Sequence, residues 1–88
     1  MAKTILVTGG SRGIGAAICR LAARDGYDVA FSYAGRTDAA ETVAADVRRT
    51  GRKAIAIKSD IADPAQVTAL FDQAAGDIGY IGAFVSNA

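Results

Sequence analysis

Three glycines near the start of the chain have a spacing that is typical of turns that bind ligands. They are Gly9, Gly13 and Gly15, within the segment T-G-G-S-R-G-I-G that follows the apolar run Ile5-Leu6-Val7. Glycine takes tight turns at positive φ and lets backbone approach a ligand closely. A turn of this kind between a strand and a helix brings a pyrophosphate to the helix N-terminus, where unpaired N–H groups and the helix dipole favour anions. The segment therefore predicts a dinucleotide-binding turn.

The residues after the expected second strand, Asp28–Tyr33, indicate which dinucleotide is bound. An NAD-selective site places a carboxylate at the carboxyl end of this strand, against the ribose 2′-hydroxyl. Here that end reads S-Y-A-G-R, without an acid, and Asp28 lies at the opposite end of the strand. Arg36 and Arg12 are placed to pair with a 2′-phosphate through parallel hydrogen bonds, although Arg36 alone fits a solvated loop residue equally well. Together these features favour NADP (NADPH), with Tyr33 beside Arg36 in the site.

Composition argues against several other kinds of site. The 88 residues carry a net charge of +1 and include no histidine and one cysteine. This balance argues against a basic nucleic-acid-binding surface, and the lack of histidine excludes a Ser-His-Asp triad and leaves zinc without ligands. No apolar run approaches the roughly 18 residues of a membrane span, and Met1-Ala2-Lys3 leaves no room for a signal peptide. The single cysteine fits a reducing compartment, so we expect a cytoplasmic location.

Alternating strand and helix patterns position the candidate residues. The expected strands are Thr4–Thr8, Asp28–Tyr33, Ala54–Ile57 and Ala83–Ser86, and the expected helices are 14–24, 38–50 and 63–76. With right-handed crossovers, this βαβαβαβ order predicts an α/β fold with a parallel sheet. We expect a partial Rossmann or doubly wound sheet with strand order 3-2-1-4. The first two helices are then expected on one face of the sheet and the third on the other. One helix cannot cover a four-stranded face, so we expect part of that face to be open.

Side-chain patterns also predict the buried faces and the caps of the helices. Asp38 is expected to cap the second helix while Glu41 reaches back, and Asp63 to cap the third just before Pro64. Cys19 is interpreted as a packing residue beside the apolar stripe of the first helix. That stripe is expected at Ile14, Ala17, Ile18, Leu21 and Ala22; the stripe of the second helix is expected at Ala40, Val43, Ala44 and Val47.

The spacing T-G-x-x-x-G-x-G at the start of such a chain resembles the short-chain dehydrogenase/reductase family, and most of all its 3-oxoacyl-acyl carrier protein reductase type. The extended sugar-nucleotide epimerase branch would need glycine in place of Arg12. The resemblance covers all 88 residues but only the N-terminal half of the family. It implies the cofactor-binding part of an NADPH-dependent carbonyl reductase or alcohol dehydrogenase, in which hydride passes between NADP(H) and the substrate.

The resemblance also assigns roles further along the chain. Asp60 and Ile61 match residues that meet the adenine, and Asn87 matches an asparagine that braces the central strand near the cofactor ribose. Ser86 replaces the first asparagine of the family's N-N-A-G motif, and Gly82 stands where an acid is frequent. The full predicted cofactor-binding set is Gly9, Ser11, Arg12, Gly13, Ile14, Gly15, Tyr33, Arg36, Asp60, Ile61, Asn87 and Ala88.

No catalytic set is expected in this chain. The family uses a tyrosine with a lysine four residues later, and none of the three tyrosines here has that lysine. Residues 1–88 are therefore interpreted as a nucleotide-binding half-domain, truncated relative to the family. The alternative is a stand-alone nucleotide-binding or protein-interaction module; the end at Asn87-Ala88, inside a family motif, favours truncation. We expect a chain of this length to self-associate through its fourth strand and the open face.

Overall fold

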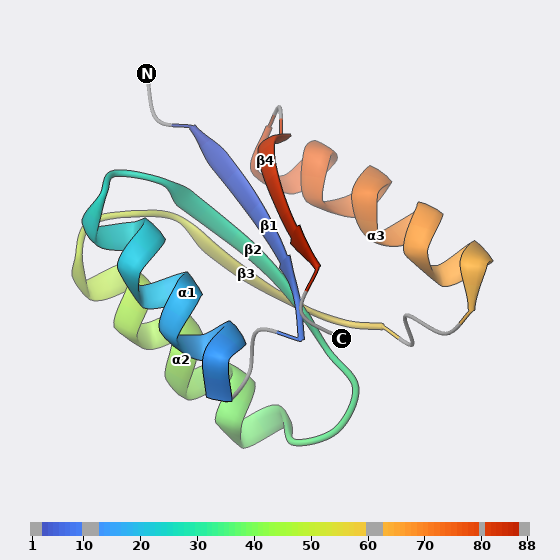
Figure 1. Ribbon diagram of the computed structural model, residues 1–88, viewed down its shortest axis with the longest axis horizontal. Helices are drawn as coiled ribbons and strands as arrows, with labels where there is room; N and C mark the ends of the chain where they lie inside the picture. Colours follow the sequence, from blue (N-terminus) through green and yellow to red (C-terminus); the bar gives the residue numbers. More distant parts are fainter. Residues whose placement is uncertain (1–2, 10–12, 60–62, 80, 87–88) are drawn as a thin grey trace.

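Strands and helices alternate along the described part of the chain, which comprises residues 3–9, 13–59, 63–79 and 81–86 of a computed structural model (Figure 1). The elements are β1 (Thr4–Thr8), α1 (Gly13–Arg24), β2 (Asp28–Tyr33), α2 (Thr37–Arg49), β3 (Ala54–Lys58), α3 (Pro64–Asp77) and β4 (Ile81–Ser86). The strands are all parallel and lie in the order β3-β2-β1-β4. This arrangement confirms the predicted fold class and strand order.

Two layers of core pack against the two faces of the sheet. Because successive side chains of a strand point to opposite faces, Val7 and Phe31 belong to the core under α1 and α2, while Leu6 and Ala30 belong to the core under α3. Figure 1 shows α1 and α2 side by side on one face and α3 on the other. Strand β1 is buried along its whole length, as expected for an inner strand covered on both faces.

The buried face of α1 differs from the predicted stripe. Its buried residues are Gly15, Ala16, Cys19, Ala22 and Ala23. Ile14 and Leu21, by contrast, are 72% and 58% exposed. Small side chains allow the helix to approach the sheet closely, so they occupy the interface although larger apolar residues lie on the neighbouring face. Cys19 is confirmed as a packing residue, but its predicted place beside the stripe is wrong, because it lies within the buried face.

The predicted caps are right for α3 and wrong for α2. The Asp63 carboxylate accepts a hydrogen bond from the Ala65 N–H at 3.0 Å, with Pro64 as the first helical residue. Helix α2 instead begins one residue earlier than expected, and Arg36 at its N-cap makes no side-chain cap hydrogen bond. The Asp38 carboxylate lies inside the first turn, because the helix begins at Thr37, and it pairs there with Arg36. The predicted stripe of α2 is confirmed as buried.

The sheet face under α3 is covered incompletely. Phe84 of β4 is 46% exposed, although its ring lies 5.1 Å from that of Phe71 on α3, centroid to centroid. Along β4 partly buried residues alternate with exposed ones. Within the described residues β4 pairs with β1 alone and forms one edge of the sheet. The open area predicted on this face therefore lies over β4.

Candidate functional site

The carboxyl ends of the strands meet at one edge of the sheet, because the strands are parallel. In open α/β sheets ligands bind outside this edge, at the point where the order of the strands reverses. Here that point is the end of β1, because the chain crosses from β1 to β2 on one side and β4 pairs with β1 on the other. The predicted dinucleotide turn follows β1 directly and therefore lies at the expected position for a ligand.

Two of the three glycines predicted for this turn adopt a backbone conformation that favours glycine, whereas Gly15 is buried within α1. Gly9 and Gly13 have φ angles of 69° and 62°, in the left-handed region that L side chains rarely adopt. The Gly9 N–H donates to the Ser32 hydroxyl at 3.2 Å, and Ser32 is buried at the end of β2. This bond ties the turn to the neighbouring strand. Sequence reasoning missed Ser32; the signal was a polar residue within an otherwise apolar strand.

The turn from β2 to α2 carries an ion pair that the sequence analysis did not foresee. Arg36 donates from Nε to Asp38 Oδ1 at 3.0 Å and from Nη2 to Oδ2 at 2.7 Å. The hydrogen bond from Arg36 is the largest cause that lowers the pKa of Asp38 to about 2, and the same contact raises the pKa of Arg36. The expectation that no acid lies near this strand end is therefore wrong, because Asp38 brings a carboxylate to it from the first turn of α2.

One cleft joins the two turns. It has a volume of about 490 Å³ and is lined by Gly13 and Ala16 of α1 and by Arg36, Asp38 and Thr42 at the start of α2, among others. The fold thus brings Gly13 and Arg36, two residues of the predicted site, to the same cleft. A ligand lying there would meet the glycine turn at one end and the Arg36–Asp38 pair at the other.

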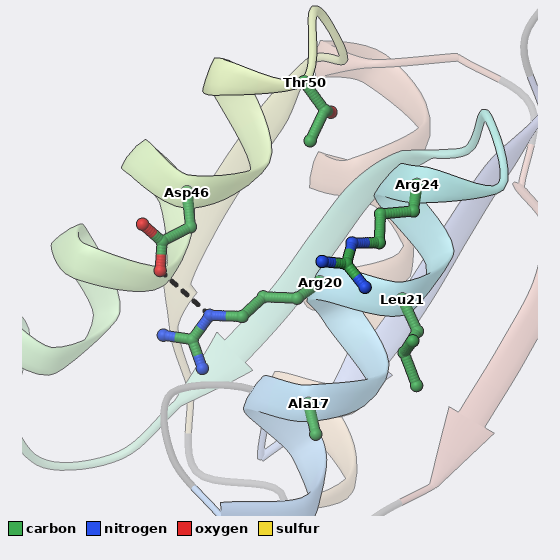
Figure 2. A pocket seen from close by; sticks show the side chains of 6 residues that line it. All are labelled: Ala17, Arg20, Leu21, Arg24, Asp46 and Thr50. Atoms are coloured by element: carbon green, nitrogen blue, oxygen red, sulfur yellow. Dashed lines mark hydrogen bonds and ion pairs between the residues drawn. The ribbon is translucent and has the colours of Figure 1, made fainter.

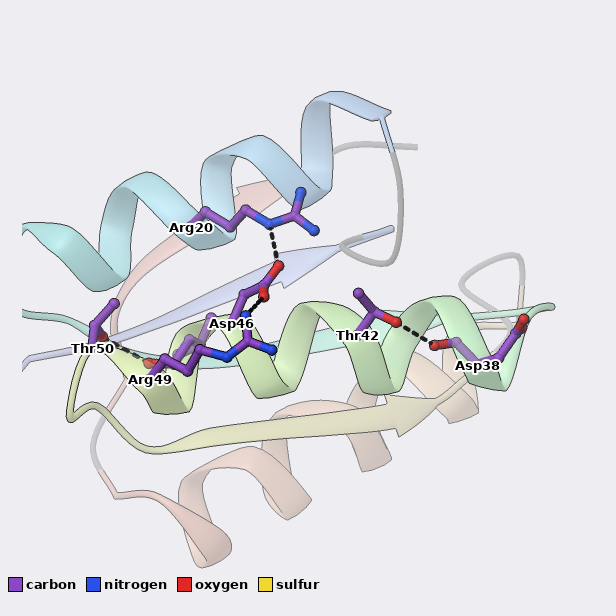
Figure 3. Close-up of polar contacts among 7 residues, drawn as sticks. Arg20, Asp38, Thr42, Asp46, Arg49 and Thr50 are labelled. Carbon is purple, nitrogen blue, oxygen red and sulfur yellow. Dashed lines mark hydrogen bonds and ion pairs between the residues drawn. The ribbon is translucent and has the colours of Figure 1, made fainter.

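Arg20 of α1 also lines this cleft, and an acid of α2 holds its side chain in place. Its Nε donates to Asp46 Oδ2 at 2.9 Å, and Arg49 Nη1 donates to the second Asp46 oxygen at 2.6 Å. Figure 3 shows the Asp46 carboxylate between the two arginines. Arg20 therefore contributes positive charge to the cleft, because it shares the single negative charge of Asp46 with Arg49.

A second cleft, of about 400 Å³, lies at the ends of β2 and β3. Ala34, Lys58, Ser59 and Gln66 line it. The Ser59 N–H donates to the Tyr33 carbonyl at 2.9 Å, which extends the pairing of the two strands. The Ser59 hydroxyl is buried without a hydrogen-bond partner among the described residues. Tyr33 does not line this cleft and is half-buried against the core under α1 and α2.

A third cleft lies between α1 and α2 and contains no predicted site residue. It is lined by Ala17, Arg20, Leu21, Arg24, Asp46 and Thr50 (Figure 2) and has a volume of about 440 Å³. Only Arg20 is shared with the cleft beside the glycine turn. No cluster of potential metal ligands occurs among the described residues, and none of the helices seen there is both long and apolar enough to span a bilayer.

The predicted site is described in part. Gly9, Gly13, Ile14 and Gly15 lie in the β1–α1 segment, and Tyr33 and Arg36 at the end of β2. Ser11, Arg12, Asp60, Ile61, Asn87 and Ala88 lie outside the described residues. Asp28, which the sequence analysis set aside, lies at the amino end of β2, where its carboxylate accepts the Lys53 N–H at 2.9 Å.

The sequence matches one protein family over nearly its whole length. The family described as short chain dehydrogenase matches residues 3–88. Versicolorin reductase stcU of Emericella nidulans is 44% identical over 86 residues, which are 98% of this chain and 33% of the relative. 3-Oxoacyl-[acyl-carrier-protein] reductase FabG of Staphylococcus aureus is 39% identical over 88 residues, all of this chain and 36% of the relative. The chain therefore spans about a third of the length of these curated relatives.

Solved structures of similar proteins have the same fold. A short-chain dehydrogenase/reductase from Serratia marcescens has a TM-score of 0.95 and 46% identity, over 98% of this chain and 35% of that chain. A short chain dehydrogenase from Burkholderia cenocepacia in complex with NADP has a TM-score of 0.95 and 48% identity over the same shares. A blue fluorescent protein from a metagenomic library, in complex with NADPH, has a TM-score of 0.94 and 45% identity, over 98% of this chain and 36% of that chain.

Proposed function

This chain belongs to the short-chain dehydrogenase family, and we propose that residues 1–88 form the NADP(H)-binding half of an oxidoreductase. The whole enzyme would transfer a hydride between NADP(H) and a carbonyl or alcohol substrate. The observation that carries the proposal is the glycine turn, with positive φ at Gly9 and Gly13, at the carboxyl edge of a parallel sheet and joined by a cleft to Arg36. Two similar proteins, whose solved structures are complexes with NADP and NADPH, support the choice of cofactor.

The described residues fit such a cofactor. Glycine backbone at positive φ leaves room for a pyrophosphate, and the first turn of α1 offers unpaired N–H groups to its oxygens. At the other end of the cleft Arg36 would bind the 2′-phosphate. When bound, the nicotinamide of NADPH supplies the hydride.

The remaining residues of the proposed site rest on the family resemblance. Ser11 would complete the glycine turn, and Asp60 with Ile61 would meet the adenine. Arg12, by its place in that turn, would pair with the 2′-phosphate together with Arg36. Asn87 and Ala88 would lie near the cofactor ribose.

The catalytic groups are proposed to belong to the part of the enzyme that these 88 residues do not include. The chain has no tyrosine followed by lysine four residues later, and it spans about a third of the relatives named as reductases. By itself it would bind the dinucleotide without reducing a carbonyl. A location in the cytoplasm is part of the proposal and is supported by the single cysteine. A stand-alone nucleotide-binding module remains the alternative, and turnover by the pure 88-residue chain would contradict both.

Calorimetric titration with NADP⁺ and NAD⁺ tests this proposal. We expect saturable binding of both, tighter for NADP⁺, and Arg36→Asp to reverse the order. Losing a charge-assisted phosphate contact costs about 1.5–3 kcal/mol, or roughly ten- to a hundredfold in affinity. Arg24→Asp is the matched control, because it makes the same charge change on an α1 residue that does not line the cleft beside the glycine turn. Absence of saturable binding for both dinucleotides would contradict the proposed function.

A further inference from the structure

The guanidinium of Arg36, which is proposed to bind the 2′-phosphate, is already paired with a carboxylate. The two carboxylate oxygens of Asp38 accept hydrogen bonds from Nε and Nη2 of Arg36. Phosphate and carboxylate oxygens fit the same planar donor fork of arginine. A 2′-phosphate that approaches this edge of Arg36 must therefore displace the Asp38 carboxylate.

The pair has little to do with holding the fold together. Both side chains are 70% exposed, and ion pairs of this exposure contribute little to stability because water and salt screen them. They can separate when a stronger anion arrives. The contact is thus better suited to a ligand-dependent role than to a structural one.

The backbone of Asp38 lies in the first turn of α2, which holds its side chain at the start of this helix and beside the cleft. Thr42 Oγ1 donates to the Asp38 carbonyl oxygen at 3.0 Å, a contact drawn in Figure 3. When a phosphate binds Arg36, the carboxylate of Asp38 therefore stays in the same cleft, where its negative charge repels the phosphate.

The other charged group lining this cleft pairs with an acid other than Asp38. Arg20 donates to Asp46 at 2.9 Å, and Asp46 shares its single negative charge between Arg20 and Arg49. Within the described residues a 2′-phosphate therefore meets Arg36 and Asp38 at the turn from β2 to α2, and Arg20 adds positive charge to the same cleft. Arg36 attracts the phosphate, whereas Asp38 both competes for Arg36 and repels the ligand.

We propose that Asp38 determines how strongly this chain prefers NADP to NAD. Its carboxylate competes with the 2′-phosphate for Arg36, whereas a dinucleotide without that phosphate binds and leaves the pair intact. The preference for NADP is accordingly modest, and the chain accepts both dinucleotides. This inference rests on the proposed function, since it concerns the same site.

Asp38→Asn tests the inference, because it removes the charge and keeps the shape and the hydrogen-bonding oxygen. Calorimetry with NADP⁺ and NAD⁺ should show the affinity ratio in favour of NADP⁺ rising about three- to tenfold, mainly through tighter NADP⁺ binding. Glu41→Gln is the matched control: it removes the same charge from an exposed position of the same helix that does not line the cleft. Asp38→Ser repeats the loss of charge with another side chain, and thermal melts check that each variant folds.

The possible results separate the two proposals. A ratio that rises in Asp38→Asn and Asp38→Ser, but not in Glu41→Gln, supports the role of Asp38. Saturable binding of both dinucleotides with the same ratio in all variants, or weaker NADP⁺ binding without Asp38, overturns this inference and leaves the proposed function standing. If the unaltered chain binds neither dinucleotide, both proposals are wrong.

Discussion

At the scale of single residues, the surroundings of a side chain decide what it can do more than its type does. Arg36 and Arg20 both line the cleft beside the glycine turn, but Arg36 is paired with Asp38, an exposed acid in the first turn of α2, and Arg20 with Asp46, a partly buried acid further along the same helix. Cys19 is chemically a nucleophile, yet it is fully buried in the core under α1. These contrasts are consistent with the proposed ligand contact of Arg36 and confirm Cys19 as a packing residue.

Cys19 gives a prediction about pH. Burial raises the pKa of its thiol from 9.0 to about 12, so the folded state favours the protonated form. The stability linked to this group is fully present below pH 9 and is lost as the pH rises toward 12. At pH 8 we expect iodoacetamide to alkylate the folded chain at least about a hundredfold more slowly than the urea-unfolded chain, because the thiolate is the nucleophile. Similar rates in the two states would contradict this; the chain has no other cysteine to confuse the signal.

At the scale of elements, the turn between β1 and α1 depends on backbone shape more than on space. Gly13 has a φ of 62°, and an added Cβ would meet nothing within 4 Å. Alanine there would be strained without a clash, and the left-handed conformation costs an L residue about 1–2 kcal/mol. The bond from the Gly9 N–H to the Ser32 hydroxyl adds a tie from this turn to β2.

We therefore expect Gly13→Ala to lower the free energy of unfolding by about 1–2 kcal/mol in urea titrations and to weaken NADP⁺ binding. Gly76→Ala is the control, since Gly76 lies in α3 without a positive φ and with open space around its Cα. Alanine in a helix is favoured over glycine by up to about 1 kcal/mol, so this variant should be as stable as the original chain or more so. If Gly13→Ala were equally harmless, the turn would not need glycine at this position.

At the scale of the whole molecule, the two faces of the sheet are covered unequally. Helices α1 and α2 cover one face, whereas within the described residues α3 is alone on the other, and Phe84 of the edge strand β4 is 46% exposed. Exposed apolar edge strands recruit other chains through their unpaired backbone groups. Self-association of the 88-residue polypeptide through β4 remains a prediction on this basis.

Sedimentation velocity tests this prediction. We expect the chain to sediment as a dimer or larger species, and Phe84→Glu to shift the distribution toward monomer because it places a charge on the associating face. Leu21→Glu, the same kind of change at a position 58% exposed on α1, should leave the distribution unaltered. A monomeric chain with a sharp cooperative melt in the same buffer would contradict the prediction.

Much of the fold and part of the site could be predicted from local sequence patterns. The order of the elements, the cap of α3 by Asp63 and the need for glycine after β1 depend on residues that are near one another in the chain, and all three are confirmed. The strand order 3-2-1-4 followed from the handedness of the crossovers, together with the family resemblance. The roles of the predicted cofactor-binding residues remain predictions.

Only the tertiary structure decided which side of α1 is buried and what Arg36 contacts. Periodicity predicted one apolar stripe on α1 that included Ile14 and Leu21, whereas close packing of the helix on the sheet buries the small residues of the neighbouring face instead. The sequence placed Asp38 as a cap, but the backbone began α2 at Thr37 and left the carboxylate within reach of Arg36. Both outcomes depend on distances set by packing in three dimensions, whereas the sequence by itself determined the elements, their order and the turn where a dinucleotide is proposed to bind.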